Sequence, residues 1–220
     1  MDETFDLPIF PLNTVVFPDQ PLSLRVFEPR YRALVSHCLA GDTEFGITLI
    51  REGKEIGGPA VPFRIGTTVS IVHHQTDPLG HIQLVVLGQR RFRILELLPG
   101  QPFPAARARA WPWAGDPPPD HGLVSVTGRL LRRYVHALTD TQETNLTPET
   151  TPRDPLTLGR LAAIVLQIPQ RQKQALLETA TSAELLSNVA ALLQAQIQIA
   201  EHTKAFGPSG PSAFQRISWN

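Results

Sequence analysis

The sequence predicts an α+β fold, in which an N-terminal antiparallel β-barrel with one early helix is followed by a C-terminal bundle of α-helices. Up to about residue 111, short apolar runs rich in β-branched residues alternate with turn signals, as in small barrels. Residues 112–120 are dense in proline, which indicates an extended linker. Beyond them, apolar residues recur at steps of three and four, the period of an amphipathic helix. We therefore expect a barrel over residues 5–111, a linker over 112–120, helices over 121–204 and a flexible tail over 205–220.

The opening stretch, residues 7–31, organises the predicted barrel. It holds two apolar extended runs, residues 7–10 and 22–27, separated by a segment punctuated with proline. Proline has no backbone N–H and fixes φ, so Pro8 and Pro11 are expected at strand edges or turns. The stretch therefore predicts an edge strand that bends, crosses over and leads into a helix.

That early helix is predicted over residues 29–40. Pro29 suits the first helical position, and Gly41 suits the C-cap. Its apolar side chains follow helical spacing and include Tyr31, Leu34, Val35 and Cys38.

Five further segments are predicted as strands or their boundaries. Runs 45–50, 67–72 and 82–87 have strand character, with a turn signal at residues 76–80. Gly88 is expected to break the third run, and a new strand is expected to begin at Arg91. The alternation over residues 105–110 predicts a last, edge strand.

The helical part begins with an apolar stripe between residues 123 and 138 and continues after a long polar loop, residues 139–157. Two helices then follow, at residues 158–166 and at about 169–179. Thr181 and Glu184 form a capping-box pattern that predicts a last helix from Ser182. Its expected apolar stripe contains Leu185, Leu186, Val189, Leu192, Leu193, Gln196 and Ile199.

Composition limits the function classes. The chain has 220 residues, 42% hydrophobic and 18% charged, which is typical of a folded globular protein. A formal net charge of +0 gives no general attraction to nucleic acid or to anionic membranes. The single cysteine excludes an internal disulfide. An acidic N-terminus and the lack of an apolar run of about 20 residues predict a cytoplasmic protein.

The opening stretch LPIFPLNTVVFPDQPLSLRVFEPRY, the run GQRRFRI at residues 88–94 and the segment from Ile168-Pro169 to QALLE at 174–178 carry a family resemblance. They resemble the N-terminal, substrate-binding domain of the Lon protease family, above all bacterial forms that consist of that domain only. The resemblance covers most of residues 5–204 and is weaker around 112–157. It implies a PUA-like β-barrel with a helical subdomain. It also implies a non-catalytic module that captures unfolded or degron-bearing polypeptides, with a protease or chaperone as a possible further partner.

Catalytic and cofactor chemistry finds little support in the residues. No P-loop pattern for ATP occurs, so no ATPase is expected. Residues 210–213 resemble the segment around the catalytic serine of Lon peptidases, but no lysine follows Ser212 to act as its base. His73 and His74 are neighbours on a predicted strand and point to opposite faces, so with His81 they are expected in solvent, not on a metal ion. We expect neither enzyme activity nor a cofactor.

The candidate binding residues are those of the opening motif, the arginine cluster and two tryptophans. They are Phe10, Phe17, Phe27, Glu28, Arg30, Tyr31, Arg90, Arg91, Trp111 and Trp113. They predict a surface for apolar or extended peptides, at a barrel edge strand or between the two halves of the chain. A purely structural interpretation stays open: Glu28 and Arg30 could form an internal ion pair, and the arginines could pair with acids such as Glu96 on a solvated strand face.

RNA binding is the alternative function. PUA-like barrels are also used for RNA, and the arginine cluster with Trp111 and Trp113 offers charge and stacking surfaces. The zero net charge argues against it.

Overall fold

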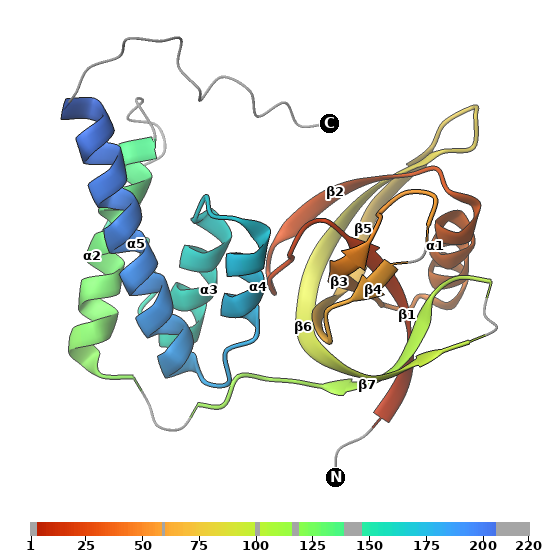
Figure 1. The fold of residues 1–220 in the computed structure, drawn as a ribbon, viewed down its shortest axis with the longest axis horizontal. Helices are drawn as coiled ribbons and strands as arrows, with labels where there is room; N and C mark the ends of the chain where they lie inside the picture. The colour runs from red at the N-terminus through yellow and green to blue at the C-terminus, as the bar shows by residue number, and fades with distance from the viewer. Residues whose placement is uncertain (1–3, 59, 100–101, 116–118, 139–146, 206–220) are drawn as a thin grey trace.

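The computed structural model describes residues 4–58, 60–99, 102–115, 119–138 and 147–205. Strands and one helix fill the N-terminal part, and four helices fill the C-terminal part (Figure 1). The first group is β1 (Thr4–Leu12), β2 (Pro21–Val26), α1 (Pro29–Gly41), β3 (Phe45–Gly53), β4 (Ala60–Pro62), β5 (Ile65–Thr76), β6 (Ile82–Leu98) and β7 (Ala105–Ala110). The second group is α2 (His121–Leu138), α3 (Pro155–Val165), α4 (Gln170–Leu177) and α5 (Ser182–Ala205). The predicted tail, with Ser212, lies outside the described residues.

Strand pairing forms a closed circuit, which we call the strand ring. The strands follow the order β1–β7–β6–β5–β3, and a parallel pairing of β1 with β3 joins the two ends. The first half of β1 pairs with β7, ending at Pro8 opposite Ala105, and the second half pairs with β3 from Ile9 onward. The prediction that β1 and β7 are edge strands is therefore wrong. Pro8, which has no N–H to donate, lies where β1 changes its pairing partner from β7 to β3.

Gly88 does not break a strand, because β6 runs through it without interruption for 17 residues. A Cβ atom at Gly88 would lie 2.2 Å from the carbonyl oxygen of Phe17. The Gly88 N–H donates to the Gln20 carbonyl, and the Gly88 carbonyl accepts from the Asp19 N–H, each at 2.9 Å. This glycine therefore permits a close backbone approach of the turn before β2.

Most helix boundaries follow local signals. Glu184 N–H donates to the Thr181 hydroxyl at 3.1 Å, and the Glu184 carboxylate accepts from Ala180 N–H at 2.8 Å, which confirms the start of α5 at Ser182. The residue with left-handed backbone after α1 is Asp42, with φ 49°, so the predicted cap at Gly41 is one position early.

Two details of the helical part were predicted incorrectly. The expected loop up to residue 157 ends sooner, because Asp154 caps α3 by accepting a hydrogen bond from Thr157 N–H at 2.8 Å and Pro155 occupies the first turn. On α5 the apolar stripe continues through Ile197, which is buried, while Ile199 is 59% exposed. Steps of four residues from Val189 through Leu193 lead to Ile197, so the buried face follows that row.

The two parts of the molecule share a hydrophobic core. Val15, Phe17, Leu49 and Ile65 from the strand part belong to the same buried cluster as side chains of the four C-terminal helices. A separate cluster fills the strand ring under α1 and includes Phe10, Tyr31, Leu34, Phe45, Val69 and Val86. In Figure 1, α4 faces the strand ring, and α2 and α5 lie on the far side of α3. Trp113 is buried and Trp111 partly buried where the chain passes from β7 toward α2.

Candidate functional site

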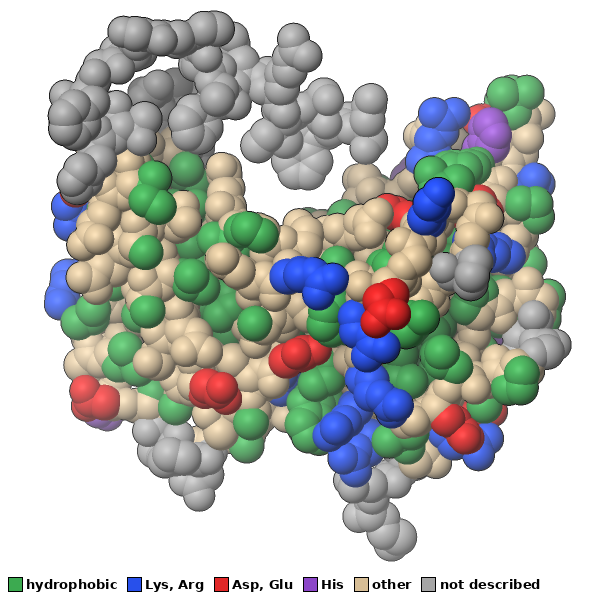
Figure 2. Space-filling view, in the orientation of Figure 1, with side chains coloured by type: hydrophobic (Ala, Val, Ile, Leu, Met, Phe, Trp, Pro, Cys, Tyr) green, Lys and Arg blue, Asp and Glu red, His purple; other side chains and the backbone are tan. Residues whose placement is uncertain are grey.

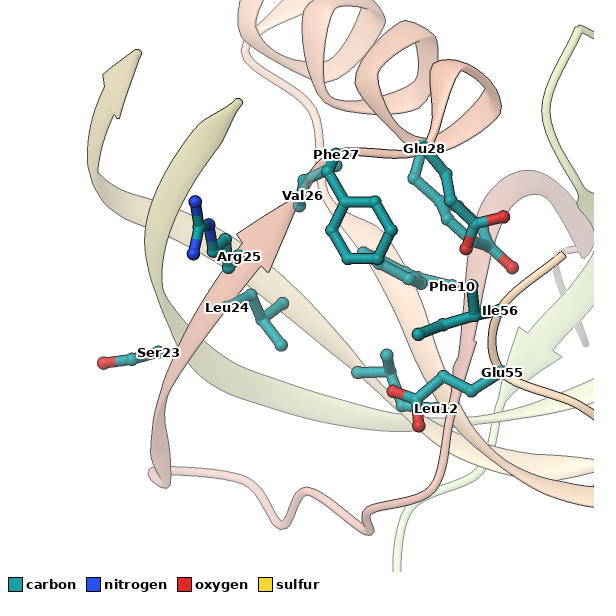
Figure 3. A pocket seen from close by; sticks show the side chains of 11 residues that line it. Phe10, Leu12, Ser23, Leu24, Arg25, Val26, Phe27, Glu28, Glu55 and Ile56 are labelled. Atoms are coloured by element: carbon teal, nitrogen blue, oxygen red, sulfur yellow. The ribbon is translucent and has the colours of Figure 1, made fainter. Parts of the chain in front are cut away.

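A pocket of about 230 Å³ opens between β2, the start of α1, the end of β1 and the segment after β3. In Figure 3, Leu12, Leu24, Phe27 and Ile56 point toward a common space, and Phe10 lies behind it. The full lining is Phe10, Leu12, Ser23, Leu24, Arg25, Val26, Phe27, Glu28, Tyr31, Glu55 and Ile56. We call this the β2 pocket.

Apolar side chains form both the floor and the mouth of the β2 pocket. The rings of Phe10 and Tyr31 are stacked in the floor, with their centroids 4.0 Å apart. At the mouth, Phe27 is 43% exposed and Ile56 is 60% exposed. Large apolar side chains gathered around a hollow leave apolar surface in water, and a ligand that covers it recovers about 25 cal/mol per Å².

An ion pair holds the segment that carries Ile56. The guanidinium of Arg30 donates to the Glu28 carboxylate at 3.0 Å and to the Gly58 carbonyl at 3.1 Å. The same Glu28 carboxylate accepts a longer hydrogen bond, 3.3 Å, from Gly57 N–H. The internal ion pair considered from the sequence is therefore present, and it positions one wall of the β2 pocket.

Electrostatics in the floor favours neutral side chains. Burial raises the pKa of Tyr31, although the nearby Arg30 guanidinium, 4.6 Å above its ring, opposes the shift. Glu55 is held by Asn13, whose side-chain amide donates to its carboxylate at 2.7 Å. The β2 pocket thus has an apolar interior, with carboxylates beside it that are already engaged.

An open strand edge borders the β2 pocket. In the described part of the chain, β2 pairs only with β6. Backbone hydrogen bonds alternate along an antiparallel pair, and the bond from Gly88 to Gln20 sets the phase. The backbone groups of Ser23 and Arg25 therefore point away from β6, toward the open edge. Unpaired strand edges are templates for pairing with a further extended chain.

The structure brings together only part of the predicted binding set. Phe10, Phe27, Glu28 and Tyr31 line the β2 pocket, and Arg30 supports it. The sequence-based set missed the rest of the lining, which is Leu12, Ser23, Leu24, Arg25, Val26, Glu55 and Ile56. Ile56 had a recognisable signal, because it is the one large apolar residue in the polar, glycine-rich segment 51–58.

Three predicted binding residues are instead interior. Phe17 is 0% exposed, Arg91 is 2% exposed and Trp113 is 9% exposed, so none of them presents a surface to a ligand. Arg91 donates to the carbonyls of Leu177 and Thr179 at the end of α4. These three residues join the strand ring to the helices, which corrects their assignment to a binding surface.

The remaining two, Arg90 and Trp111, lie outside the β2 pocket. Arg90 is exposed and pairs with Glu44 at 3.6 Å. Trp111 is partly buried, and the guanidiniums of Arg93 and Arg109 lie 4.8 and 5.5 Å from its ring centroid. Because Arg91 and Trp113 are buried, the arginine and tryptophan face invoked for RNA is divided between the interior and the surface.

Basic side chains form a band over the strand part in Figure 2, with acidic side chains beside it. Arg107 pairs with Asp6 at 3.1 Å and with Glu96 at 3.8 Å, as the structural interpretation of the arginines expected. The carboxylates of Asp6 and Glu96 thereby compensate the charge of Arg107.

The described residues show neither a metal-binding cluster nor a membrane-spanning helix. His81 pairs with Asp77 at 3.0 Å, but the described residues contain no group of three or more His, Cys, Asp or Glu side chains arranged to hold a metal ion. Across the same part of the chain, every helix is too short or too polar to span a bilayer.

Known proteins share this architecture. A crystal structure of a Lon N-terminal domain protein from Xanthomonas campestris is 27% identical, with a TM-score of 0.64, and the match covers 85% of this chain and 98% of that one. The N-terminal domain of the Mycobacterium avium complex Lon protease has a TM-score of 0.67 over 86% of this chain and 98% of that one. At 16% identity, the second likeness shows the fold alone.

Sequence relatives are much longer proteins. The Lon protease of Dictyoglomus thermophilum is 26% identical over 197 residues, which is 89% of this chain and 25% of that protein. Lon protease 2 of Myxococcus xanthus is 31% identical over 182 residues, 79% of this chain and 21% of that protein. The chain thus spans about a quarter or less of these relatives.

The family model that matches this chain describes the substrate-binding domain of the ATP-dependent protease La (LON), and the match extends over residues 6–195. That range begins within β1 and ends within α5, and it includes every residue of the β2 pocket. The chain therefore belongs to the LON substrate-binding domain family.

Proposed function

We propose that this chain is a non-catalytic recognition module that binds exposed, extended segments of other polypeptides in the β2 pocket. The family is described as substrate-binding. The match to the Lon protease of Dictyoglomus thermophilum covers 25% of that protein, and the rest of that protein lies outside the match. In this proposal the strand ring is a PUA-like β-barrel, and the C-terminal helices are a bundle that supports it. Clients are unfolded or degron-bearing polypeptides, and a protease or chaperone acts on what is captured.

One observation carries the proposal: exposed Phe27 and Ile56 flank a hollow beside the open edge of β2. An extended peptide that pairs with this edge would satisfy the outward backbone groups of Ser23 and Arg25. Every second side chain of that peptide would then point toward the apolar walls formed by Leu24, Phe27 and Ile56. Backbone pairing gives tolerance of sequence, and the pocket gives preference for apolar residues.

Fluorescence anisotropy with a labelled, permanently unfolded client tests this. We expect Phe27→Ala and Ile56→Ala each to weaken binding about three- to tenfold, because each removes part of the apolar contact area. The matched control is Val72→Ala, since Val72 is 61% exposed on β5 and β6 separates it from β2. Absence of binding by the unchanged protein at tens of micromolar would refute the proposal.

A further inference from the structure

A second pocket, independent of the β2 pocket, has the composition of an anion site. It measures about 440 Å³ and lies between the first turns of α2 and the segment before α3. Its polar lining includes His121, Ser125, Arg129, Arg132, Thr151 and Arg153. No Asp or Glu stands among the described residues that line it. Its volume is in the range of small-molecule sites.

Among the described residues, the arginines of this α2 pocket form no ion pair, in contrast to several arginines elsewhere in the molecule. Arg30, Arg90 and Arg107 each form an ion pair with a carboxylate. Within the described part of the chain, neither Arg129 nor Arg153 has an ion-pair partner. Guanidinium groups that line one pocket without counter-charges repel one another, so a bound anion would lower the free energy of this arrangement.

Arg132 is oriented by a hydroxyl group and not neutralised by an acid. Its guanidinium donates to the Thr151 hydroxyl at 3.1 Å, and that hydroxyl donates in turn to the Thr147 carbonyl at 2.7 Å. The Thr151 proton is therefore engaged, and its oxygen is fixed as an acceptor for Arg132. The other N–H groups of the planar guanidinium stay available for a ligand, in the fork geometry that suits phosphate oxygens.

Three acidic residues, Asp120, Glu149 and Asp154, lie within two positions of the lining in sequence, and none of them lines the α2 pocket. The Asp154 carboxylate accepts hydrogen bonds from the backbone N–H and the hydroxyl of Thr157. Glu149 is on the same segment as Thr151. Its pKa is lowered first by a hydrogen bond from Thr147 and only lastly by the charge of Arg132. Glu149 does not line the α2 pocket. It therefore leaves the positive charge of the pocket largely uncompensated.

Gly128 forms part of the wall of the α2 pocket. It lies in the interior of α2, where glycine costs roughly 1 kcal/mol relative to alanine. A Cβ atom there would lie 3.4 Å from the Thr151 methyl carbon and 3.6 Å from a terminal nitrogen of Arg132. An alanine there would be in ordinary van der Waals contact with both groups, and the additional methyl groups of a valine would compete with them for space between α2 and the segment 148–153.

We propose that the α2 pocket binds a small phosphate-bearing molecule, through the guanidiniums of Arg129, Arg132 and Arg153 with Ser125 as an additional hydroxyl donor. The phosphate group is chosen over a carboxylate because three forked donors match several oxygens on one centre. This inference does not rest on peptide binding in the β2 pocket, and the two sites are tested with different ligands.

Isothermal titration calorimetry at fixed ionic strength tests it, with inorganic phosphate, pyrophosphate and ribose 5-phosphate as separate probes on the full chain. The three arms distinguish free phosphate from an organic phosphomonoester. We expect saturable binding of at least one probe to the unchanged protein. That binding should be about tenfold weaker in each of the two single variants Arg129→Gln and Arg153→Gln. The matched control is Arg133→Gln, because Arg133 is on the same helix but pairs with Glu201.

Three outcomes would overturn the proposal. The first is that no probe binds at about 10 mM, roughly ten times the usual upper level of cellular metabolites. The second is that Arg133→Gln weakens phosphate binding as much as the pocket variants do, and the third is that only a single-stranded RNA oligonucleotide binds. A thermal melt of each variant separates loss of the site from loss of folding. A Gly128→Val variant that melts like the unchanged protein but loses the phosphate signal would support the pocket independently. Peptide binding in the β2 pocket should be unchanged in all of these variants.

Discussion

The guanidinium of Arg91 lies 3.5 Å from the ring centroid of Trp113, in the interior between the strand ring and the helices. Trp113 donates its indole N–H to the Thr179 hydroxyl at 2.8 Å, and Arg91 donates to the Thr179 carbonyl. Burial lowers the pKa of Arg91 to about 9. Carbonyls at the C-terminal end of a helix carry partial negative charge. The buried guanidinium of Arg91 therefore stabilises the C-terminal end of α4 and joins it to β6.

Replacing Arg91 should therefore loosen the junction between the two parts of the protein. Arg91→Lys keeps a charge but loses the planar guanidinium that stacks on Trp113, and we expect a loss of about 2 kcal/mol or more in the free energy of unfolding. Urea unfolding followed by tryptophan fluorescence measures this. The control, Arg90→Lys, changes an exposed neighbour and should stay close to the unchanged protein. Equal stability of the two variants would contradict the role given to Arg91.

Gly88 should tolerate no side chain. Gly88→Ala places a Cβ atom against the Phe17 carbonyl, so either β6 or the turn before β2 must shift, and we expect a loss of about 2 kcal/mol or more. Gly115→Ala is the control, because a Cβ atom at Gly115 meets nothing within 4 Å. Thermal melting of both variants checks the prediction. A melting point for Gly88→Ala equal to that of the control would show that the turn can move freely.

The sequence predicted elements whose signals are local. Pro29 and the Thr181–Glu184 pair mark helix starts within a few residues of themselves, and the structure confirms both starts. The closure of the strand ring depends instead on Ile9 pairing with Gly46, a parallel contact between distant residues. No local pattern encodes that register, so β1 was predicted as an edge.

The candidate site shows the same division between residues that local sequence groups together and residues that long-range contacts bring in. Phe10, Phe27 and Tyr31 come from one continuous motif, and their grouping could be predicted from it. Ile56 lies on the segment after β3, which Arg30 and Glu28 hold through contacts across the fold. Arg91 was predicted to lie on a surface together with its neighbours. The alternation within β6 does not show which of its faces the helices cover, because long-range packing decides this.

The cap of α3 should be sensitive to acid. Hydrogen bonds from Thr157 lower the pKa of Asp154 below 3.8, so the carboxylate stabilises the folded state above that pH. The folded protein binds the proton less readily than the unfolded chain, and the contribution is lost as the pH falls through the lowered pKa. Asp154→Ala should cost about 0.5–1 kcal/mol at pH 7 and progressively less below pH 4. Urea unfolding of both proteins across pH 3–7 tests this, and a difference at pH 3 as large as the difference at pH 7 would contradict it.

The mode of peptide binding can be separated from the mere presence of an apolar pocket. The outward N–H of Ser23 makes no bond to β6, so Ser23→Pro should fold, since proline is tolerated on a strand edge. If an incoming peptide pairs with β2, this variant loses one backbone donor and adds a ring at the edge, and affinity should fall about tenfold. Ser23→Ala, which keeps the N–H, should bind as the unchanged protein does. Anisotropy with the same unfolded client measures both. Should Ser23→Pro bind normally while Phe27→Ala does not, the client would be held by side-chain contacts alone, and the open edge of β2 would have no part in recognition.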